Sequence, residues 1–237
     1  MLNSALDMAA HARPFSEHGR VQIPELLEPV YADALEACLR TDVPWGLSTL
    51  ENGKGLTRTA DEVAQMSRAD WQKLMLEVQN TAREGYQFIF NSYQMVTAWK
   101  EKRDPELLLH PFLEFLNSAP VLEFARAVTG CQNIMKADAQ ATRYLPGHFL
   151  RRHDDFGQKS ATDSRLVAYV LNLSRDWHAD WGGLLQFLDE NERVTESWVP
   201  RFNCLSLFKV PAWHCVSCVA PYATAPRLAI TGWFRSH

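Results

Sequence analysis

The chain has 237 residues, 46% of them hydrophobic, so it is long enough to bury one large core with an added layer of helices. Its 24 basic and 28 acidic residues give a formal net charge of -4, which argues against a basic nucleic-acid-binding surface. The five cysteines, an odd number, argue against a disulfide framework, and no run reaches the ~18 apolar residues of a membrane span.

The first half of the chain carries mainly helical patterns. Residues 1–20 form a polar lead-in without an apolar leader, so we expect a cytoplasmic protein with no membrane partner. Residues 46–55 are predicted to be a loop with a turn at Asn52-Gly53. Apolar spacing and capping residues predict helices over 25–39, 67–84, 107–116 and 118–129, with short strands over 21–23 and 86–90.

From about residue 133 the pattern changes to short strand-like runs separated by turns, which is typical of a sandwich or jelly roll. We therefore predict a single α+β domain over 1–237, with a mainly helical support region at 1–132 and a jelly-roll catalytic core at 133–237. The expected strands lie at 134–144, 165–173, 183–188, 204–210, 214–219 and 227–233.

A His-x-Asp pair, His153 and Asp155, follows the Pro146-Gly147 turn at the end of a strand-like run. Residues two apart on a strand project to the same face, so the imidazole and the carboxylate can share one metal ion. His214 in a later strand-like run supplies a third ligand. Two imidazoles and one carboxylate form the facial triad of non-haem Fe(II) oxygenases, which keeps coordination positions open for reactants.

Two other groups of metal-binding residue types compete with this triad. A second His-x-Asp pair, His178 and Asp180, lies in a connection ahead of two glycines, where a hydrogen-bonded loop imidazole is the simpler interpretation. Cys215 and Cys218 form a single thiol pair, whereas structural zinc commonly takes two such pairs, so both are interpreted as core residues.

Arg227 lies on a strand-like run in which Ala229, Thr231 and Trp233 share its face. A buried arginine on an apolar strand needs an anionic partner, because an unpaired buried charge is costly. A guanidinium binds a carboxylate through two parallel hydrogen bonds, as the distal carboxylate of 2-oxoglutarate would require. The alternative is an internal salt bridge to an Asp or Glu.

These motifs occur together and in one order over residues 140–235. Tyr144-x-Pro-Gly precedes His153-x-Asp155, and Arg165 then opens a hydrophobic strand; Asp176-Trp177 with Gly182-Gly183, His214-x-Val216 and Arg227-x-Ala-Ile-Thr-x-Trp233 follow. This series resembles the prolyl 4-hydroxylase-like branch of the Fe(II)/2-oxoglutarate-dependent dioxygenases. The first half of the chain resembles the helical support of that family only in its mainly helical pattern.

The resemblance implies a double-stranded β-helix, the jelly-roll, cupin-like core of that family. It implies that His153, Asp155 and His214 bind Fe(II) and that Arg227 holds the distal carboxylate of 2-oxoglutarate. It further implies that Tyr144 and Thr231 assist and that Trp233 lines the site. O2 is the second co-substrate, succinate and CO2 are the co-products, and ascorbate is a candidate reductant.

Two departures from the family pattern affect the expected 2-oxoglutarate pocket. In an ungapped alignment Asn172 takes the position of a family Tyr that reaches the 2-oxoglutarate carboxylate; its amide still offers one hydrogen bond. The connection 217–226 between His214 and Arg227 is also longer than is usual in the family.

The expected activity is hydroxylation of an unactivated C–H bond, with a prolyl residue of a protein or peptide as the leading substrate. One alternative is a hydroxylase of a small molecule, such as a free amino acid or a secondary metabolite. Two others are a non-catalytic jelly-roll protein that binds metal or ligand, and a zinc hydrolase indifferent to 2-oxoglutarate and O2. No nucleic-acid partner is expected, and the pattern leaves the oligomeric state open.

Overall fold

The computed structural model describes residues 1–155 and 164–237 and combines helices with a large antiparallel sheet. The helices are α1 (Met8–His18), α2 (Pro29–Thr41), α3 (Ala60–Ala64), α4 (Arg68–Glu84), α5 (Met95–Glu101), α6 (Leu109–Leu116), α7 (Ala119–Thr129) and the 3-10 helix η1 (Ala179–Trp181). The strands are β1 (Arg20–Ile23), β2 (Gly46–Glu51), β3 (Lys54–Arg58), β4 (Phe88–Tyr93), β5 (Lys136–Ala137), β6 (Gln140–Tyr144), β7 (Phe149–His153), β8 (Arg165–Asn172), β9 (Leu185–Leu188), β10 (Val194–Trp198), β11 (Cys204–Lys209), β12 (His214–Val216) and β13 (Arg227–Arg235).

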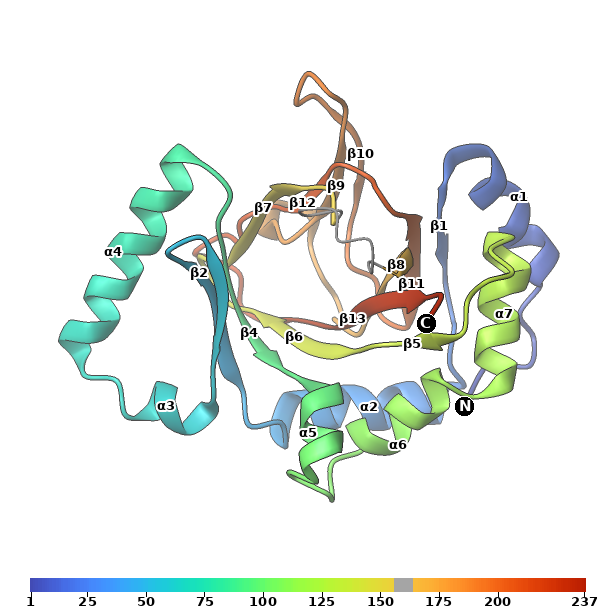
Figure 1. The fold of residues 1–237 in the computed structure, drawn as a ribbon, viewed down its shortest axis with the longest axis horizontal. Helices are drawn as coiled ribbons and strands as arrows, with labels where there is room; N and C mark the ends of the chain where they lie inside the picture. Colours follow the sequence, from blue (N-terminus) through green and yellow to red (C-terminus); the bar gives the residue numbers. More distant parts are fainter. Residues whose placement is uncertain (156–163) are drawn as a thin grey trace.

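The strands form one curled sheet in the order β1-β11-β8-β13-β6-β4-β7-β12-β9-β10, with the β2–β3 hairpin attached to β4. Apart from the β2–β3 and β9–β10 hairpins, the paired strands are not consecutive in the sequence, and every pairing in the described residues is antiparallel. The sheet curls around an interior, as Figure 1 shows. The predicted α+β jelly-roll fold class is confirmed.

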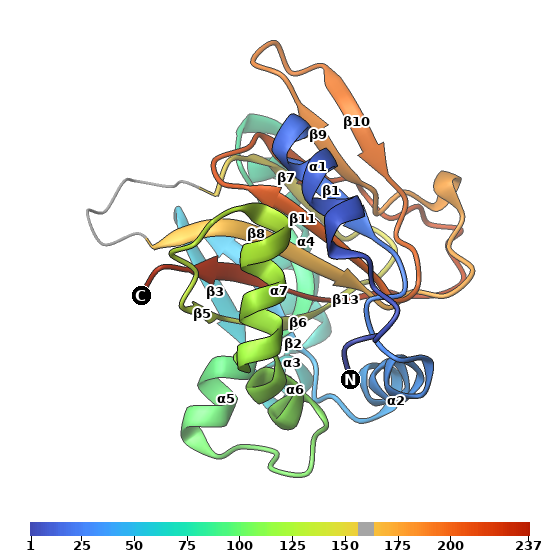
Figure 2. The same cartoon turned by 90° about the vertical axis from the view of Figure 1, so that its right-hand side faces the viewer.

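Helices cover the outer face of the sheet, and its inner face is left to the interior of the barrel. Strand alternation assigns each residue to one face. On β8, Val167, Tyr169 and Leu171 belong to the main hydrophobic core together with Leu35 and Leu39 of α2. Figures 1 and 2 show α2, α6 and α7 outside the sheet, and α4 beyond β2. No described helix is long and apolar enough to cross a membrane.

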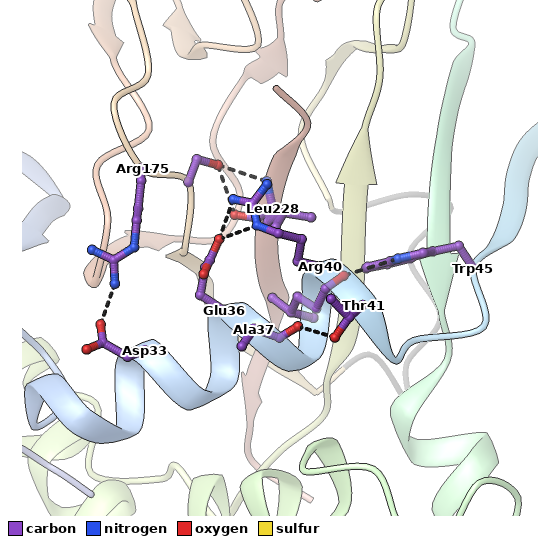
Figure 3. A network of polar contacts seen from close by, with 10 residues as sticks. Asp33, Glu36, Ala37, Arg40, Thr41, Trp45, Arg175 and Leu228 are labelled. Carbon is purple, nitrogen blue, oxygen red and sulfur yellow. Dashed lines mark hydrogen bonds and ion pairs between the residues drawn. The ribbon is translucent and has the colours of Figure 1, made fainter. Parts of the chain in front are cut away.

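Polar contacts on the α2 side connect the helix to the segment that follows β8. Asp33 of α2 forms an ion pair with Arg175, as Figure 3 shows. Close by, the Leu228 amide donates to Ser174 Oγ at 2.8 Å, and the Leu173 amide donates to the Leu228 carbonyl at 2.9 Å. These bonds fix the first residues of β13, where Arg227 lies.

Two N-terminal segments differ from the sequence prediction. The polar lead-in contains α1, which begins after Asp7, whose carboxylate accepts from the Ala9 and Ala10 amides, and ends at left-handed Gly19. Pro14 inside this helix and its single buried residue, Phe15, hid the helical pattern. The next helix, α2, begins at Pro29 rather than Glu25, because Glu25 takes a positive φ and proline favours the first helical position.

The predicted loop at 46–55 is largely wrong, because these residues form most of the β2–β3 hairpin. The predicted turn at Asn52-Gly53 is present: both residues have positive φ, 51° and 73°, as a type I′ hairpin turn requires. Polar and glycine residues on both strands concealed the alternation. β3 is exposed along its length except for partly buried Arg58, which forms an ion pair with Glu51.

Candidate metal and co-substrate site

His153, Asp155 and His214 converge beside the paired strands β7 and β12. His153 ends β7 and His214 begins β12, and these two residues pair directly across the antiparallel strands. Asp155 follows β7 with a φ of +62°, which turns its carboxylate back toward both rings. His153 Nε2 lies 3.3 Å from Asp155 Oδ1, and His214 Nε2 lies 3.7 Å from Asp155 Oδ2. The three candidate ligand atoms all lie within 4.8 Å of one another.

Backbone carbonyls orient both imidazoles. His153 Nδ1 lies 2.9 Å from the Arg151 carbonyl, and His214 Nδ1 lies 2.7 Å from the Ala212 carbonyl. An Nδ1–H that donates to a carbonyl leaves the Nε2 lone pair available, which is the usual arrangement of a metal-binding histidine. Both Nε2 atoms face the Asp155 carboxylate.

The charge states of His214 and Asp155 suit metal binding at neutral pH. Burial lowers the pKa of His214 to about 4, and the neighbouring His153 adds to that shift. Burial by itself would raise the pKa of Asp155, but the contacts of its carboxylate with His153, with His214 and with the Trp233 indole N–H lower it to about 2. A neutral imidazole and an ionised carboxylate are the protonation states that metal ligation requires.

Trp233 holds the carboxylate of the triad. Its indole Nε1–H donates to Asp155 Oδ2 at 3.1 Å, so Trp233 orients a predicted ligand as well as lining the site. Thr231 lies two residues earlier on β13 and therefore faces the same side of the strand. Both residues line the cavity that contains the triad.

Arg227 lines the same cavity and is buried, with 1% of its surface exposed. Its Nε has no hydrogen-bond partner, and one terminal nitrogen donates to Asn172 Oδ1 at a long 3.4 Å. No acidic group of the described residues forms an ion pair with it, so the internal salt bridge is not present there. Burial lowers the pKa of Arg227, as expected for a charge taken out of water.

The surroundings of Arg227 fix the guanidinium in place. Its carbon Cζ lies 5.1 Å from the ring centroid of Tyr144, and burial raises the pKa of that phenol, which stays protonated. Gly183 has a φ of +62°, and a Cβ at this position would come within 3.1 Å of Arg227 Cδ and 3.2 Å of Trp177. The Gly182-Gly183 motif therefore provides the close packing that a larger residue would prevent.

One cavity of about 550 Å³ connects the triad with Arg227. It brings together seven of the eight predicted site residues: His153, Asp155, His214, Arg227, Tyr144, Thr231 and Trp233. Asn172 is the exception. Asn172 is buried and donates to the Cys204 carbonyl at 3.4 Å. Its Oδ1 accepts from Arg227, so Asn172 helps to hold the guanidinium in place without lining the cavity.

Several cavity residues were not predicted from the sequence. One wall of the cavity is lined by Tyr86, Phe88 and Phe90. The ring centroids of Tyr86 and Phe88 are 5.8 Å apart and those of Phe88 and Phe90 are 5.5 Å apart. Phe90 stacks on Tyr144 with 5.1 Å between centroids. Their alternation in an expected strand was a usable signal. Burial and the charge of Asp155 raise the pKa of Tyr86 to about 12.

The competing metal-binding residues lie apart from the triad. Within the described ranges, His153, Asp155 and His214 form the only group of three or more such residues close enough to share an ion. His178 instead packs against the Trp181 ring, 4.8 Å between centroids, at the start of η1. Cys215 and Cys218 are free thiols, and Cys218 is exposed rather than in the core.

The donor set fits the metal that the geometry suggests. Two imidazole nitrogens and one carboxylate on one side of an ion suit Fe(II) with open coordination positions. The partnerless Nε of Arg227 in the same cavity suits a ligand carboxylate, since an unsatisfied buried charge is otherwise costly.

Comparison with known proteins agrees with this geometry. Residues 139–235 match the model of the 2OG-Fe(II) oxygenase superfamily. Over 104 residues the chain is 33% identical to mouse (Mus musculus) prolyl 3-hydroxylase OGFOD1, a match that covers 41% of this chain and 18% of that protein. The chain thus spans less than a fifth of that relative.

Two solved structures share the fold over nearly the whole chain. A Pseudomonas putida prolyl-4-hydroxylase is similar with a TM-score of 0.59 and 21% identity, over 96% of this chain and 98% of that one. A Trichoplax adhaerens prolyl hydroxylase, solved with a peptide fragment of hypoxia inducible factor, gives a TM-score of 0.64 and 15% identity, over 97% and 89%. Residues 139–235 thus match the 2OG-Fe(II) oxygenase superfamily, and the chain shares its fold with prolyl hydroxylases.

Proposed function

We propose that this chain, acting as one domain, is an Fe(II)- and 2-oxoglutarate-dependent dioxygenase that hydroxylates an unactivated C–H bond. The observation that carries the proposal is that Arg227 shares one cavity with an open two-histidine, one-carboxylate group. A metal-binding protein without 2-oxoglutarate, or a zinc hydrolase, has no use for a buried guanidinium without a carboxylate partner at that position.

Each residue of the cavity has a distinct role in this proposal. His153, Asp155 and His214 hold the metal through Nε2, a carboxylate oxygen and Nε2. Arg227 binds the distal carboxylate of 2-oxoglutarate, with Tyr144 and Thr231 as neighbouring hydroxyl donors. Asn172 keeps the guanidinium in position through its 3.4 Å contact, and Trp233 orients Asp155.

Bound iron would supply the oxidation chemistry, using O2 and 2-oxoglutarate to place a hydroxyl group on the substrate with release of succinate and CO2. The protein orients the reactants and keeps water away from them. The rings of Tyr86, Phe88, Phe90 and Tyr144 provide that apolar wall between the triad and Arg227. Ascorbate is proposed as the reductant that maintains Fe(II).

The proposed substrate is a prolyl residue of a protein or peptide. The mouse relative is named a prolyl 3-hydroxylase, and the Trichoplax structure holds a peptide fragment in a protein of the same fold. These names support the substrate class.

The experiment that tests the activity measures O2 uptake and succinate formation by the Fe(II)-loaded protein with 2-oxoglutarate. We expect slow turnover without substrate, stimulation by some members of a proline-containing peptide library, and a mass increase of one oxygen atom. Arg227→Ala should abolish both rates at moderate 2-oxoglutarate concentration. A wild-type protein that retains iron yet consumes no 2-oxoglutarate would favour the non-catalytic alternative.

A further inference from the structure

Asp138, between β5 and β6, holds the last part of β13 through its side chain. It lies directly opposite Trp233, because Gln140 pairs with Thr231, two positions away on each strand. The two residues of a hydrogen-bonded antiparallel pair normally exchange two backbone hydrogen bonds. One of these is present, since the Asp138 amide donates to the Trp233 carbonyl at 3.2 Å. In place of the other, the Trp233 amide donates to Asp138 Oδ1 at 2.7 Å.

The backbone carbonyl of Asp138 accepts from a different strand. Tyr169 of β8 donates its hydroxyl to this carbonyl at 2.6 Å. Gly232 permits the close approach, because a Cβ there would come within 2.1 Å of the Asp138 carbonyl oxygen and 2.8 Å of its Oδ1. The carboxylate of Asp138 therefore replaces a main-chain acceptor, and its charge strengthens a hydrogen bond that would otherwise be neutral.

The second oxygen of the same carboxylate holds Arg235. Arg235 Nε forms an ion pair with Asp138 Oδ2, and the two side chains are only 25% and 26% exposed. The guanidinium carbon of Arg235 lies 5.6 Å from the centroid of the Trp233 ring, and that of Arg165 lies 5.1 Å from it. One carboxylate thus fixes both the backbone of Trp233 and a cation that packs against its ring.

Trp233 connects this arrangement to the metal site. Its indole Nε1–H donates to Asp155 Oδ2 at 3.1 Å. Asp155 follows the end of β7 with a positive φ, so contacts of its side chain decide where the carboxylate points. Asp138 does not line the cavity, and any effect that it has on the metal must pass through Trp233.

We propose that Asp138 is a positioning residue of the metal site, which holds the Trp233 indole on the Asp155 carboxylate and so orients a metal ligand from outside the cavity. Resting on the proposed Fe(II) site, this role adds to it an acidic residue that does not itself bind the metal. If Asp138 served only to join β13 to its neighbours, its loss would lower the melting temperature without affecting the indole or the metal.

The first measurement follows the Trp233 indole N–H of the metal-free protein by two-dimensional NMR, with the signal identified by its loss in Trp233→Phe. Asp155→Ala gives the position of the signal without its acceptor. We expect Asp138→Ala to move the signal most of the way to that position and Glu51→Ala to leave it unchanged. Glu51 is the matched control, because its ion pair with Arg58 is similarly buried, at 25% and 22% exposed, and neither residue lines the cavity.

The second measurement is the Fe(II) affinity under anaerobic conditions, by competition with a chelator dye. Asp138→Ala should weaken Fe(II) binding by about fivefold in the otherwise unchanged protein, and should cause no further loss in Trp233→Phe, because the effect passes through the indole. Asp138→Asn keeps one neutral acceptor and should give intermediate values of both quantities. This nearly isosteric variant replaces Asp138→Ala if the alanine variant does not fold.

An unchanged indole signal in every folded Asp138 variant would overturn the inference. So would a loss of Fe(II) affinity that is equally large in the Trp233→Phe background, since Asp138 would then act by another route. Failure of the wild type to bind Fe(II), measured first, would instead remove the proposed function, and the role of Asp138 with it, whatever the indole signal shows.

Discussion

At the scale of single residues, Asp155 depends on its neighbours. Two imidazoles face its oxygens at 3.3 and 3.7 Å, and the Trp233 indole donates to it at 3.1 Å. Asp155 has a positive φ and lies outside β7, so regular strand geometry does not fix the position of its side chain. Loss of a hydrogen-bond partner of a metal ligand typically lowers metal affinity or activity by about 10- to 100-fold.

Trp233→Phe should therefore weaken Fe(II) binding by about tenfold while the fold is retained, because the ring remains and only the donor is lost. Competition with a metal-sensitive chelator dye measures the affinity. Trp99→Phe is the control, since the Trp99 indole donates to Glu114 on the outer surface of the helices. Equal affinities in the two variants would show that the indole does not orient Asp155.

His148 should make stability dependent on pH. Burial lowers its pKa from 6.5 to about 4, so the unfolded chain binds more protons than the folded one between these values. The free energy of unfolding should therefore fall as the pH is lowered from about 6.5 toward 4. In His148→Leu, the slope of the unfolding free energy against pH in this window should decrease by an amount equivalent to up to one bound proton. Urea unfolding of the metal-free protein at several pH values measures this slope. An unchanged slope would mean that another group controls this dependence.

The sequence was informative for residues joined by local spacing and less so for those joined by strand register. His153 and Asp155 are two positions apart, and Arg227, Thr231 and Trp233 alternate on one strand, so their shared faces were predictable. Gln94 and Gln140 are 46 positions apart and meet only because β4 pairs with β6. No local pattern encodes that pairing, and the support of Arg227 by Asn172 was likewise hidden.

At the scale of elements, the turn before β9 determines how Arg227 is packed. Gly182 and Gly183 both have positive φ, and a Cβ on Gly182 would come within 2.0 Å of the Cys218 carbonyl. The Trp177 indole donates to the Gly182 carbonyl at 2.9 Å, which fixes the turn against the Trp177 ring. The two glycines let the turn approach the buried guanidinium.

Gly183→Ala should weaken 2-oxoglutarate binding by about tenfold and leave Fe(II) binding nearly unchanged. The added methyl group both requires an unfavourable φ and presses on Arg227 Cδ. Gly85→Ala is the matched control, because Gly85 has an ordinary φ of -170° and nothing within 4 Å of a Cβ. Calorimetric titration measures the dissociation constant of 2-oxoglutarate for both variants. An unchanged dissociation constant in Gly183→Ala would contradict the packing role.

Element prediction succeeded where capping and periodicity agreed. The helix α4 begins after Ser67, whose hydroxyl accepts from the Asp70 amide, and ends at Gly85, as its sequence predicts. The β2–β3 hairpin failed this test, since its strands carry glycine and polar residues and acquire their structure by pairing with β4. Tertiary pairing there overrides a weak local preference.

At the scale of the whole molecule, apolar packing of helices against the outer face of the sheet stabilises the barrel that holds the triad. Leu35 of α2 is fully buried in this core, whereas the Asp33–Arg175 ion pair on the same helix is about half exposed. Figure 3 shows Arg175, from the segment after β8, pointing to Asp33 on α2. Burial therefore contributes more to stability than the ion pair.

Leu35→Ala should lower the free energy of unfolding by about 2–5 kcal/mol, because it removes buried methyl groups and leaves a cavity. Asp33→Asn should lower it by less than about 1 kcal/mol, as is typical of solvent-exposed ion pairs. Urea unfolding of the two variants measures both values. Equal losses would mean that the ion pair, and not the core, attaches α2 to the sheet.

The most direct test of the proposed site is anaerobic titration of the Fe(II)-loaded protein with 2-oxoglutarate, followed by visible absorption. We predict a weak metal-to-ligand charge-transfer band that saturates at one equivalent, is lost in His153→Ala and needs much more 2-oxoglutarate in Arg227→Ala. The exposed variant Arg13→Ala should behave as the wild type. A fully iron-loaded wild type without this band would contradict the assignment of 2-oxoglutarate to the cavity between the triad and Arg227.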